Sequence, residues 1–155
     1  MKNTVFNENV YIEYPDDFHE MSNEELQKYF AGNLLRFGAK NDDKHVILSV
    51  AKTANKLVAV FTNTKSVLSG AESTLKKNLK DYTRIDEFDA EIFGEKAKGI
   101  RFKYSAIDKD VKQFCEIAVV KSKRCFYVLY CLSRLNDADE NLNLFKEFRN
   151  SLRFV

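Results

Sequence analysis

Residues 125–132, with the sequence CFYVLYCL, form the longest apolar block of the chain. A strand with one face in solvent alternates apolar and polar side chains, whereas this block is apolar on both faces. We therefore expect it to form a central strand of a sheet that is covered on both sides. Residues 121–124, with the sequence KSKR, precede it and are typical of a turn from an earlier strand.

The length of this turn decides where two of the three cysteines lie. A three-residue loop would place Cys115 opposite Cys131, whereas a four-residue loop would place them on opposite faces and exclude a disulfide. Both lengths stay open, and we favour four residues. Because Cys115, Cys125 and Cys131 all lie in apolar, strand-like sequence, we expect them to be free and reduced.

Three segments carry the signals of amphipathic helices. Ser22 and Glu25 form a capping box, in which the hydroxyl accepts from a free backbone N–H and the carboxylate reaches back. Gly32 either ends this helix early or is tolerated inside it. Residues 65–81 carry an apolar stripe at helical spacing, and Asp137 begins a last helix.

The remaining segments predict strands joined by turns. Residues 99–107 alternate between apolar and polar side chains, which predicts that the polar side, with Arg101, Lys103 and Ser105, faces solvent. Residues 37–45, with the sequence FGAKNDDKH, have the composition of a loop. Further strands are expected at residues 10–14, 45–52, 83–93 and 112–120.

The order of these segments predicts the class of fold. Antiparallel strands without a repeating strand–helix–strand unit are typical of an α+β protein. Because the central strand needs cover on both faces, we expect an α/β/α sandwich, in which a mostly antiparallel sheet has helices on both faces. The apolar run at residues 57–61 is either a strand or irregular. No linker or internal repeat is visible, so we expect one domain over residues 1–155.

Composition and charge argue against two classes of protein. The 13 Phe and 7 Tyr give far more apolar bulk than a disordered chain carries. The 25 basic residues are nearly balanced by 23 acidic ones, for a net charge of +2. The basic clusters at residues 76–80 and 121–124 are separated by an acidic run at 86–91, so we expect no nucleic-acid partner.

The distribution of apolar residues also indicates in which compartment of the cell the protein is expected. Residues 1–9 contain no apolar run of the length found in signal peptides. No stretch of the chain approaches the roughly 20 apolar residues that a membrane-spanning helix needs. We therefore expect a cytoplasmic protein without a membrane span, or an exported one if a leader has been removed from the sequence.

The polar residues offer little catalytic chemistry. His19 lies near Asp16 and Asp17, and these three residues are the only candidates for a metal or acid–base site, although a histidine beside turn acids is more often a surface feature. A Cys–His nucleophile would need an exposed cysteine, which the strand settings argue against. Glycine-rich phosphate loops and nucleophile elbows are absent, so we predict no catalytic residue and no cofactor.

Four strings carry a resemblance to a known superfamily: VYIEYPDDF at residues 10–18, VILSV at 46–50, IFGEKA at 92–97 before IRF at 100–102, and FYVL at 126–129. Together with the order of elements, they resemble the PsbP-like superfamily. This superfamily includes the Ran-binding Mog proteins, the PsbP proteins of the photosystem and the bacterial DcrB-like proteins. The resemblance spans most of the chain and implies an α/β/α sandwich that serves as a binding or assembly module rather than as a catalyst.

Two functions follow as alternatives. The first is a non-catalytic module that binds another protein through a sheet edge or through exposed aromatic residues such as Tyr11, Tyr14 or Tyr104. The second is a small-ligand binder or weak enzyme with a pocket between the sheet and a helix. An exposed apolar patch would favour the first function, and a concave pocket with converging polar groups would favour the second.

Overall fold

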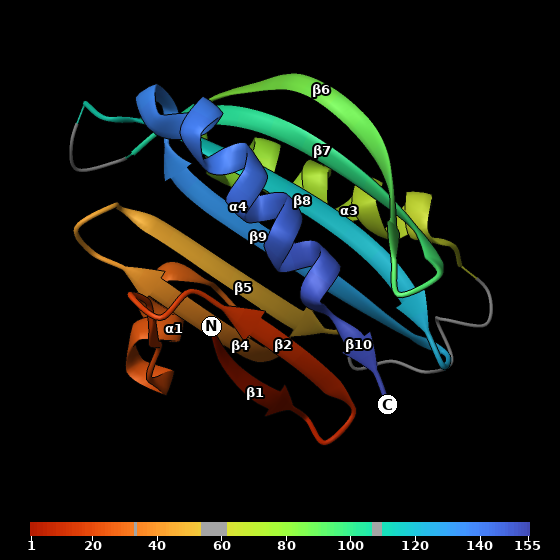
Figure 1. Cartoon of the computed structure of the whole chain (residues 1–155). Coiled ribbons are helices and arrows are strands. Elements are labelled where there is room, and N and C mark those ends of the chain that lie inside the picture. The colour runs from red at the N-terminus through yellow and green to blue at the C-terminus, as the bar shows by residue number, and fades with distance from the viewer. Residues whose placement is uncertain (33, 54–61, 107–109) are drawn as a thin grey trace.

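The computed structural model describes residues 1–32, 34–53, 62–106 and 110–155, and two antiparallel sheets dominate it (Figure 1). The larger sheet has seven strands and the smaller has three. In spatial order, the larger sheet consists of β3 (His19–Glu20), β4 (Leu35–Asn41), β5 (Val46–Lys52), β9 (Cys125–Arg134), β8 (Lys112–Ser122), β7 (Glu95–Ser105) and β6 (Lys80–Ile92). The smaller sheet consists of β1 (Lys2–Phe6), β2 (Val10–Tyr14) and β10 (Arg153–Phe154).

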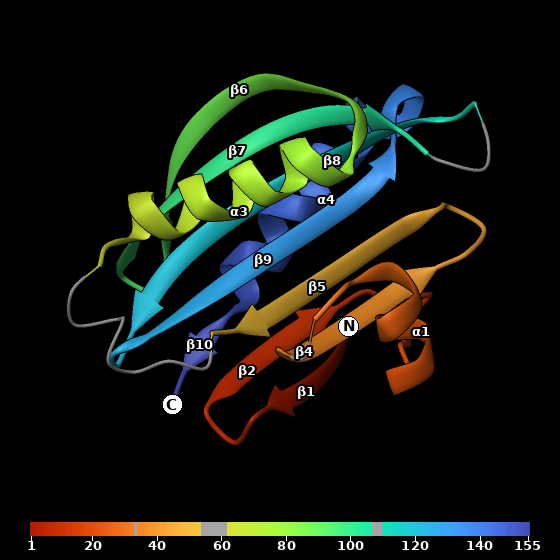
Figure 2. The same cartoon turned by 180° about the vertical axis from the view of Figure 1, so that it is seen from behind.

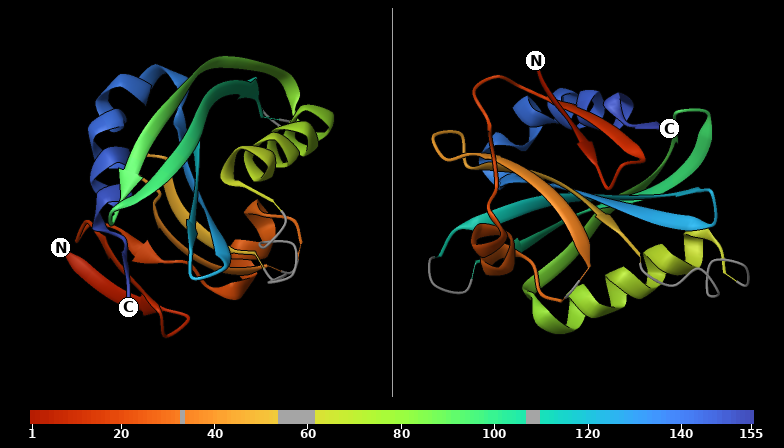
Figure 3. Two further views of the ribbon diagram at one scale, coloured as in Figure 1. Left: turned by 90° about the vertical axis from the view of Figure 1, so that its right-hand side faces the viewer. Right: turned by 90° about the horizontal axis from the view of Figure 1, so that it is seen from below.

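In the described ranges, three α-helices pack against the larger sheet, namely α1 (Asn23–Tyr29), α3 (Thr64–Asn78) and α4 (Ala138–Ser151). A short 3₁₀ turn, Leu135–Asp137, leads into α4. Figure 3 shows α4 and the smaller sheet on one face of the larger sheet, with α1 and α3 on the other. We call these two faces the closed face and the open face. The expected α/β/α sandwich is confirmed, although the small sheet adds to the layer that contains α4.

The strand β9 is the fourth of the seven strands, as its apolar sequence predicts. Its side chains alternate between two separate clusters of buried residues. On the closed face, Leu129 and Cys131 join the cluster that contains Phe145 of α4. On the open face, Phe126 and Val128 join the cluster that contains Leu68 of α3, together with Ile100, Phe102, Cys115, Ile117 and Val119.

The β8–β9 turn is shorter than either expected length. Ser122 lies opposite Cys125, so only Lys123 and Arg124 form the turn. Both have positive φ angles, 49° and 65°, as this class of two-residue hairpin turn requires. This register has the same parity as the four-residue loop, so Cys115 and Cys131 lie on opposite faces, and all three cysteines are free and buried.

The predicted loop at residues 37–45 is wrong, because residues 35–41 form β4 and only residues 42–45 lie outside the strands. Gly38 and the polar residues after it gave the segment the composition of a loop. A Cβ atom at Gly38 would lie 2.7 Å from Cδ2 of Leu26 and 2.8 Å from Sδ of Met21. The glycine therefore lets α1 approach the strand closely, which is a recognised role of glycine inside strands.

The helices largely follow their sequence signals. The Ser22 hydroxyl accepts from the Glu25 N–H at 3.2 Å, and the Glu25 carboxylate accepts from the Ser22 N–H at 3.1 Å, which confirms the capping box. The helix α1 ends at Tyr29, so Gly32, with φ of 97°, lies beyond it. The second helix ends at Asn78 rather than at residue 81, because β6 begins at Lys80.

Three further outcomes concern the remaining predictions for the chain. The prediction that Arg101 and Ser105 face solvent is wrong, because Ser105 is buried and Arg101 is half-buried on the closed face. The apolar run at residues 57–61 lies outside the described residues. Among the residues that the structure describes, no helix has both the length and the hydrophobicity needed to cross a bilayer.

Candidate functional site

The three predicted candidates for a metal or acid–base site bind to different partners. The Asp16 carboxylate pairs with the N-terminal ammonium group at 3.0 Å. Asp17 pairs with Lys44 at 2.8 Å, whereas Nε2 of His19 lies 3.6 Å from the Glu25 carboxylate. Within the described ranges, no group of three His, Cys, Asp or Glu side chains is arranged to hold a metal ion.

The cysteines offer no activated nucleophile. Burial raises the pKa of both Cys115 and Cys131 well above the ordinary value of a thiol, so neither forms a thiolate near neutral pH. Both histidines, His19 and His45, lie on the exposed surface, whereas the cysteines are buried. The structure therefore brings no cysteine and histidine together in the way that this chemistry needs.

The three tyrosines named as possible binding residues have different environments. Tyr14 is buried, and its ring packs against Phe37 with 5.5 Å between the ring centroids, so its expected exposure is wrong. Tyr11 is half-buried and donates a hydrogen bond to Glu13 at 2.9 Å. Tyr104 is also half-buried, at the end of β7, where it lines a groove on the open face.

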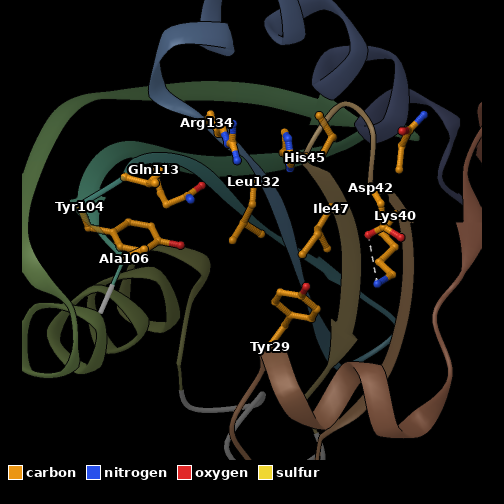
Figure 4. A pocket seen from close by; sticks show the side chains of 13 residues that line it. Tyr29, Lys40, Asp42, His45, Ile47, Tyr104, Ala106, Gln113, Leu132 and Arg134 are labelled. Carbon is orange, nitrogen blue, oxygen red and sulfur yellow. Dashed lines mark ion pairs between the residues drawn. The ribbon is translucent and has the colours of Figure 1, made fainter. Parts of the chain in front are cut away.

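This groove lies at the end of the sheet where β4, β7 and β9 finish (Figure 4), and its volume is about 360 Å³. Tyr29 of α1 lines one side and Tyr104 lines another, and Figure 4 shows both hydroxyl groups turned toward the space between them. Ile47 and Leu132 form an apolar floor. Arg134, Gln113 and His45 line the rim, together with Lys40 and Asp42.

Strand register explains why these side chains meet. Paired residues in neighbouring strands project from the same face of a sheet. Gln113 lies opposite both Arg134 and Tyr104, which places the three in one row across β9, β8 and β7. Ile47 lies opposite both Lys40 and Leu132, which forms the neighbouring row across β4, β5 and β9. The groove is therefore a consequence of strand pairing, and the pairing of β5 with β9, which are distant in sequence, brings the two rows together.

The two ends of the groove differ in charge. Lys40 lies between Glu25, at 2.7 Å, and Asp42, at 3.2 Å. The hydrogen bond from Lys40 lowers the pKa of Glu25 to about 2, and the same contact raises the pKa of Lys40. At the other end, burial raises the pKa of Tyr104 well above its ordinary value, so its hydroxyl stays protonated.

A second hollow, of about 370 Å³, lies beside α1. Leu26, Phe30, Leu34 and Leu35 contribute its apolar lining, and we call these four residues the α1–β4 edge. Leu34 is 41% exposed and Leu35 is 50% exposed. The helix α1 ends at Tyr29, before Gly32, and both leucines lie beyond it at the surface.

The closed face holds a polar cluster of a different kind. The Glu116 carboxylate is almost fully buried, and it binds Nε of Arg101 at 2.9 Å and Nη1 of Arg149. The centroid of the Phe88 ring lies 4.2 Å from the guanidinium carbon of Arg101 and 4.9 Å from that of Arg149. A Cβ atom at Gly99 would overlap this ring, so the glycine makes room for it.

Comparison with known proteins identifies the fold. No protein-family description and no curated protein sequence matches the chain. Among solved structures, it resembles the cyanobacterial PsbP (CyanoP) from Synechocystis sp. PCC 6803, with a TM-score of 0.72 and 10% identity over 99% of this chain and 92% of that one.

Two other solved structures show the same likeness. A protein of unknown function from Pseudomonas aeruginosa, PA94, described as a putative regulator, has a TM-score of 0.57 and 10% identity over 95% of this chain and 92% of that one. LpqN of Mycobacterium tuberculosis, involved in cell envelope biogenesis, has a TM-score of 0.60 and 15% identity over 94% and 83% of the two chains. The chain therefore has the PsbP-like fold, as its sequence strings predict.

Proposed function

We propose that this chain is a non-catalytic module that binds another protein through the α1–β4 edge. The observation that carries the proposal is the exposure of Leu34 and Leu35 beside the half-buried Leu26 and Phe30. Apolar side chains that gather around an open hollow lose contact with water when a partner covers them, and such patches often mark interaction sites.

The neighbouring strand supports the same proposal. On its outer side, β4 pairs with β3 through Lys40 and Ala39, and the N–H of Met21 donates to the Gly38 carbonyl at 2.8 Å. Among the described residues, no strand pairs with residues 35–37 on that side. An unpaired strand edge next to apolar side chains is a common place for a partner to bind.

Quantitative affinity capture from lysates of the source cells would test this proposal. The double variant Leu34→Ser, Leu35→Ser removes the exposed leucines, while Ile85→Ser removes an equally exposed residue, 47% accessible, from β6 at the far edge. We expect a protein that the wild type and Ile85→Ser capture equally and that the double variant captures about tenfold less. Equal capture of every protein by all three chains would contradict the proposal.

A small-ligand function is the second candidate, because polar side chains converge on an apolar floor in the groove. For either function we place the chain in the cytoplasm, which its three free cysteines support. The neighbours described above are not named for any reaction, which supports a role without catalysis.

A further inference from the structure

Arg134, at the rim of the groove, differs from the other partly buried arginines. Arg36 lies 4.1 Å from the centroid of the Phe30 ring and 5.0 Å from that of Tyr130, measured from its guanidinium carbon. Arg101 and Arg149 share the Glu116 carboxylate. The half-buried Arg134 side chain has no hydrogen bond, ion pair or aromatic contact with any residue that the structure describes.

Two further polar groups lie next to this arginine. Gln113 is directly opposite Arg134 in β8, and Tyr104 is directly opposite Gln113 in β7. In the described part of the chain, neither side chain forms a hydrogen bond. The guanidinium, the amide and the protonated hydroxyl all donate hydrogen bonds, and a planar carboxylate matches the fork of an arginine.

The rest of the groove limits what else the ligand can carry. Ile47 and Leu132 offer an apolar surface, and the Tyr29 ring stands beside them, so the body of the ligand should be apolar or aromatic. Lys40 is flanked by two carboxylates, those of Glu25 and Asp42, so this end carries a net negative charge. A second acidic group on the ligand would be repelled there.

The geometry points to a site for a small monocarboxylate with an apolar or aromatic body. Its carboxylate binds Arg134, with Gln113 and Tyr104 as further donors, and its body lies on Ile47 and Leu132. The volume of about 360 Å³ is near the lower end of the range for small-molecule sites, roughly 300–1,000 Å³. This inference goes beyond the protein partner proposed above, and it rests on the second candidate function, because it names the chemistry of the ligand that the groove would take.

Isothermal titration calorimetry on the full chain tests the site with two probes, phenylacetate and hexanoate, each compared with its neutral amide. We expect at least one acid to bind more tightly than its amide. Arg134→Gln should weaken its binding about tenfold or more, since a charge-assisted hydrogen bond is lost. Arg134→Lys should weaken it by less, because the charge remains without the fork.

Two control variants test whether the loss of binding is specific to Arg134. Arg124→Gln removes an exposed arginine from the β8–β9 turn and should leave the affinity unchanged. The double variant Leu34→Ser, Leu35→Ser should also bind the acid normally, so the site can fail while the protein-binding proposal stands, or the reverse. The inference is overturned if neither acid binds better than its amide, or if a folded Arg134→Gln binds the acid as tightly as the wild type.

Discussion

Two arginines on the closed face of the seven-stranded sheet and one on its open face have opposite surroundings. On the closed face, Arg101 and Arg149 share the buried Glu116 carboxylate beneath α4. On the open face, Arg134 stands at the rim of a groove, without a partner among the described residues. In the view from behind in Figure 2, α3 crosses the half of the sheet that contains β7 and β8, whereas no helix of the described residues crosses most of β5.

This difference implies that the closed-face arginines contribute to stability, whereas Arg134 is available for binding. A buried charge is tolerated only where other groups of the protein neutralise it, so the charges of the closed face hold the fold. A charge at an open groove keeps its water and can exchange it for a ligand. We therefore expect that variants of the closed face change the free energy of unfolding, and that variants of the groove change binding.

The largest effect is expected for Glu116→Gln. This change leaves Arg101 and Arg149 without their shared countercharge, and breaking a buried ion pair costs about 3–5 kcal/mol. Urea denaturation would measure the loss. Asp86→Asn is the control, because Asp86 is the other ion-pair partner of Arg101 and is half-exposed. We expect this variant to lose less than about 1 kcal/mol of stability. Similar losses for the two variants would contradict the contrast between buried and exposed partners.

A matched pair of glycine variants should change stability in opposite directions. Gly99→Ala places a methyl group in the space occupied by the Phe88 ring, and we expect a loss of about 1–3 kcal/mol from overpacking. Gly70→Ala lies on the exposed side of α3 with open space around it, and should add about 0.5–1 kcal/mol. If Gly99→Ala were neutral in denaturation experiments, the Phe88 ring would not be held at this position.

Arg134→Gln should leave the fold intact. Since its side chain has no partner among the described residues, we expect its free energy of unfolding to stay within about 0.5 kcal/mol of the wild type. The same urea denaturation measures this value beside that of Glu116→Gln. A loss of several kcal/mol would mean that Arg134 supports the fold, and the comparison of the two faces would fail.

The smallest effect is expected in the free energy of unfolding at acid pH, where Glu25 becomes protonated. The pKa of Glu25 is lowered from 4.5 to about 2, chiefly by the hydrogen bond from Lys40, so its contribution to stability is present above pH 4.5 and is lost as the pH falls through 2. Urea midpoints measured across this window should therefore converge for the wild type and Glu25→Gln as the pH falls. A difference between them that did not shrink with pH would exclude this role for Glu25.

The sequence predicted the parts of the fold that local patterns determine. The apolar block at residues 125–132 is the central strand, and the capping box begins α1. The strand β4 was missed because a glycine such as Gly38 is typical of a loop. Only the structure shows that Gly38 makes room for Leu26 of α1. The prediction that Arg101 faces solvent was wrong because its ion-pair partner, Glu116, lies on another strand.

The groove could not be predicted for a related reason. Its residues come from six elements and the turns between them, and only the register of the strands brings Tyr104, Gln113 and Arg134 into one row. That register depends on the two-residue turn at Lys123 and Arg124, which is shorter than the three or four residues expected from the sequence. Local patterns identify which side chains are buried, whereas the positions of polar groups relative to one another depend on long-range pairing.

A map of amide chemical shifts in the ¹⁵N-labelled chain during titration with phenylacetate would locate the ligand site on one face of the sheet. We expect the shifts to concentrate at Gln113, Leu132 and Arg134, and Val120 and Phe145 on the closed face not to respond. Shifts centred on the closed face, or no saturable shifts in the groove, would contradict the claim that the open face binds ligand while the closed face holds the fold.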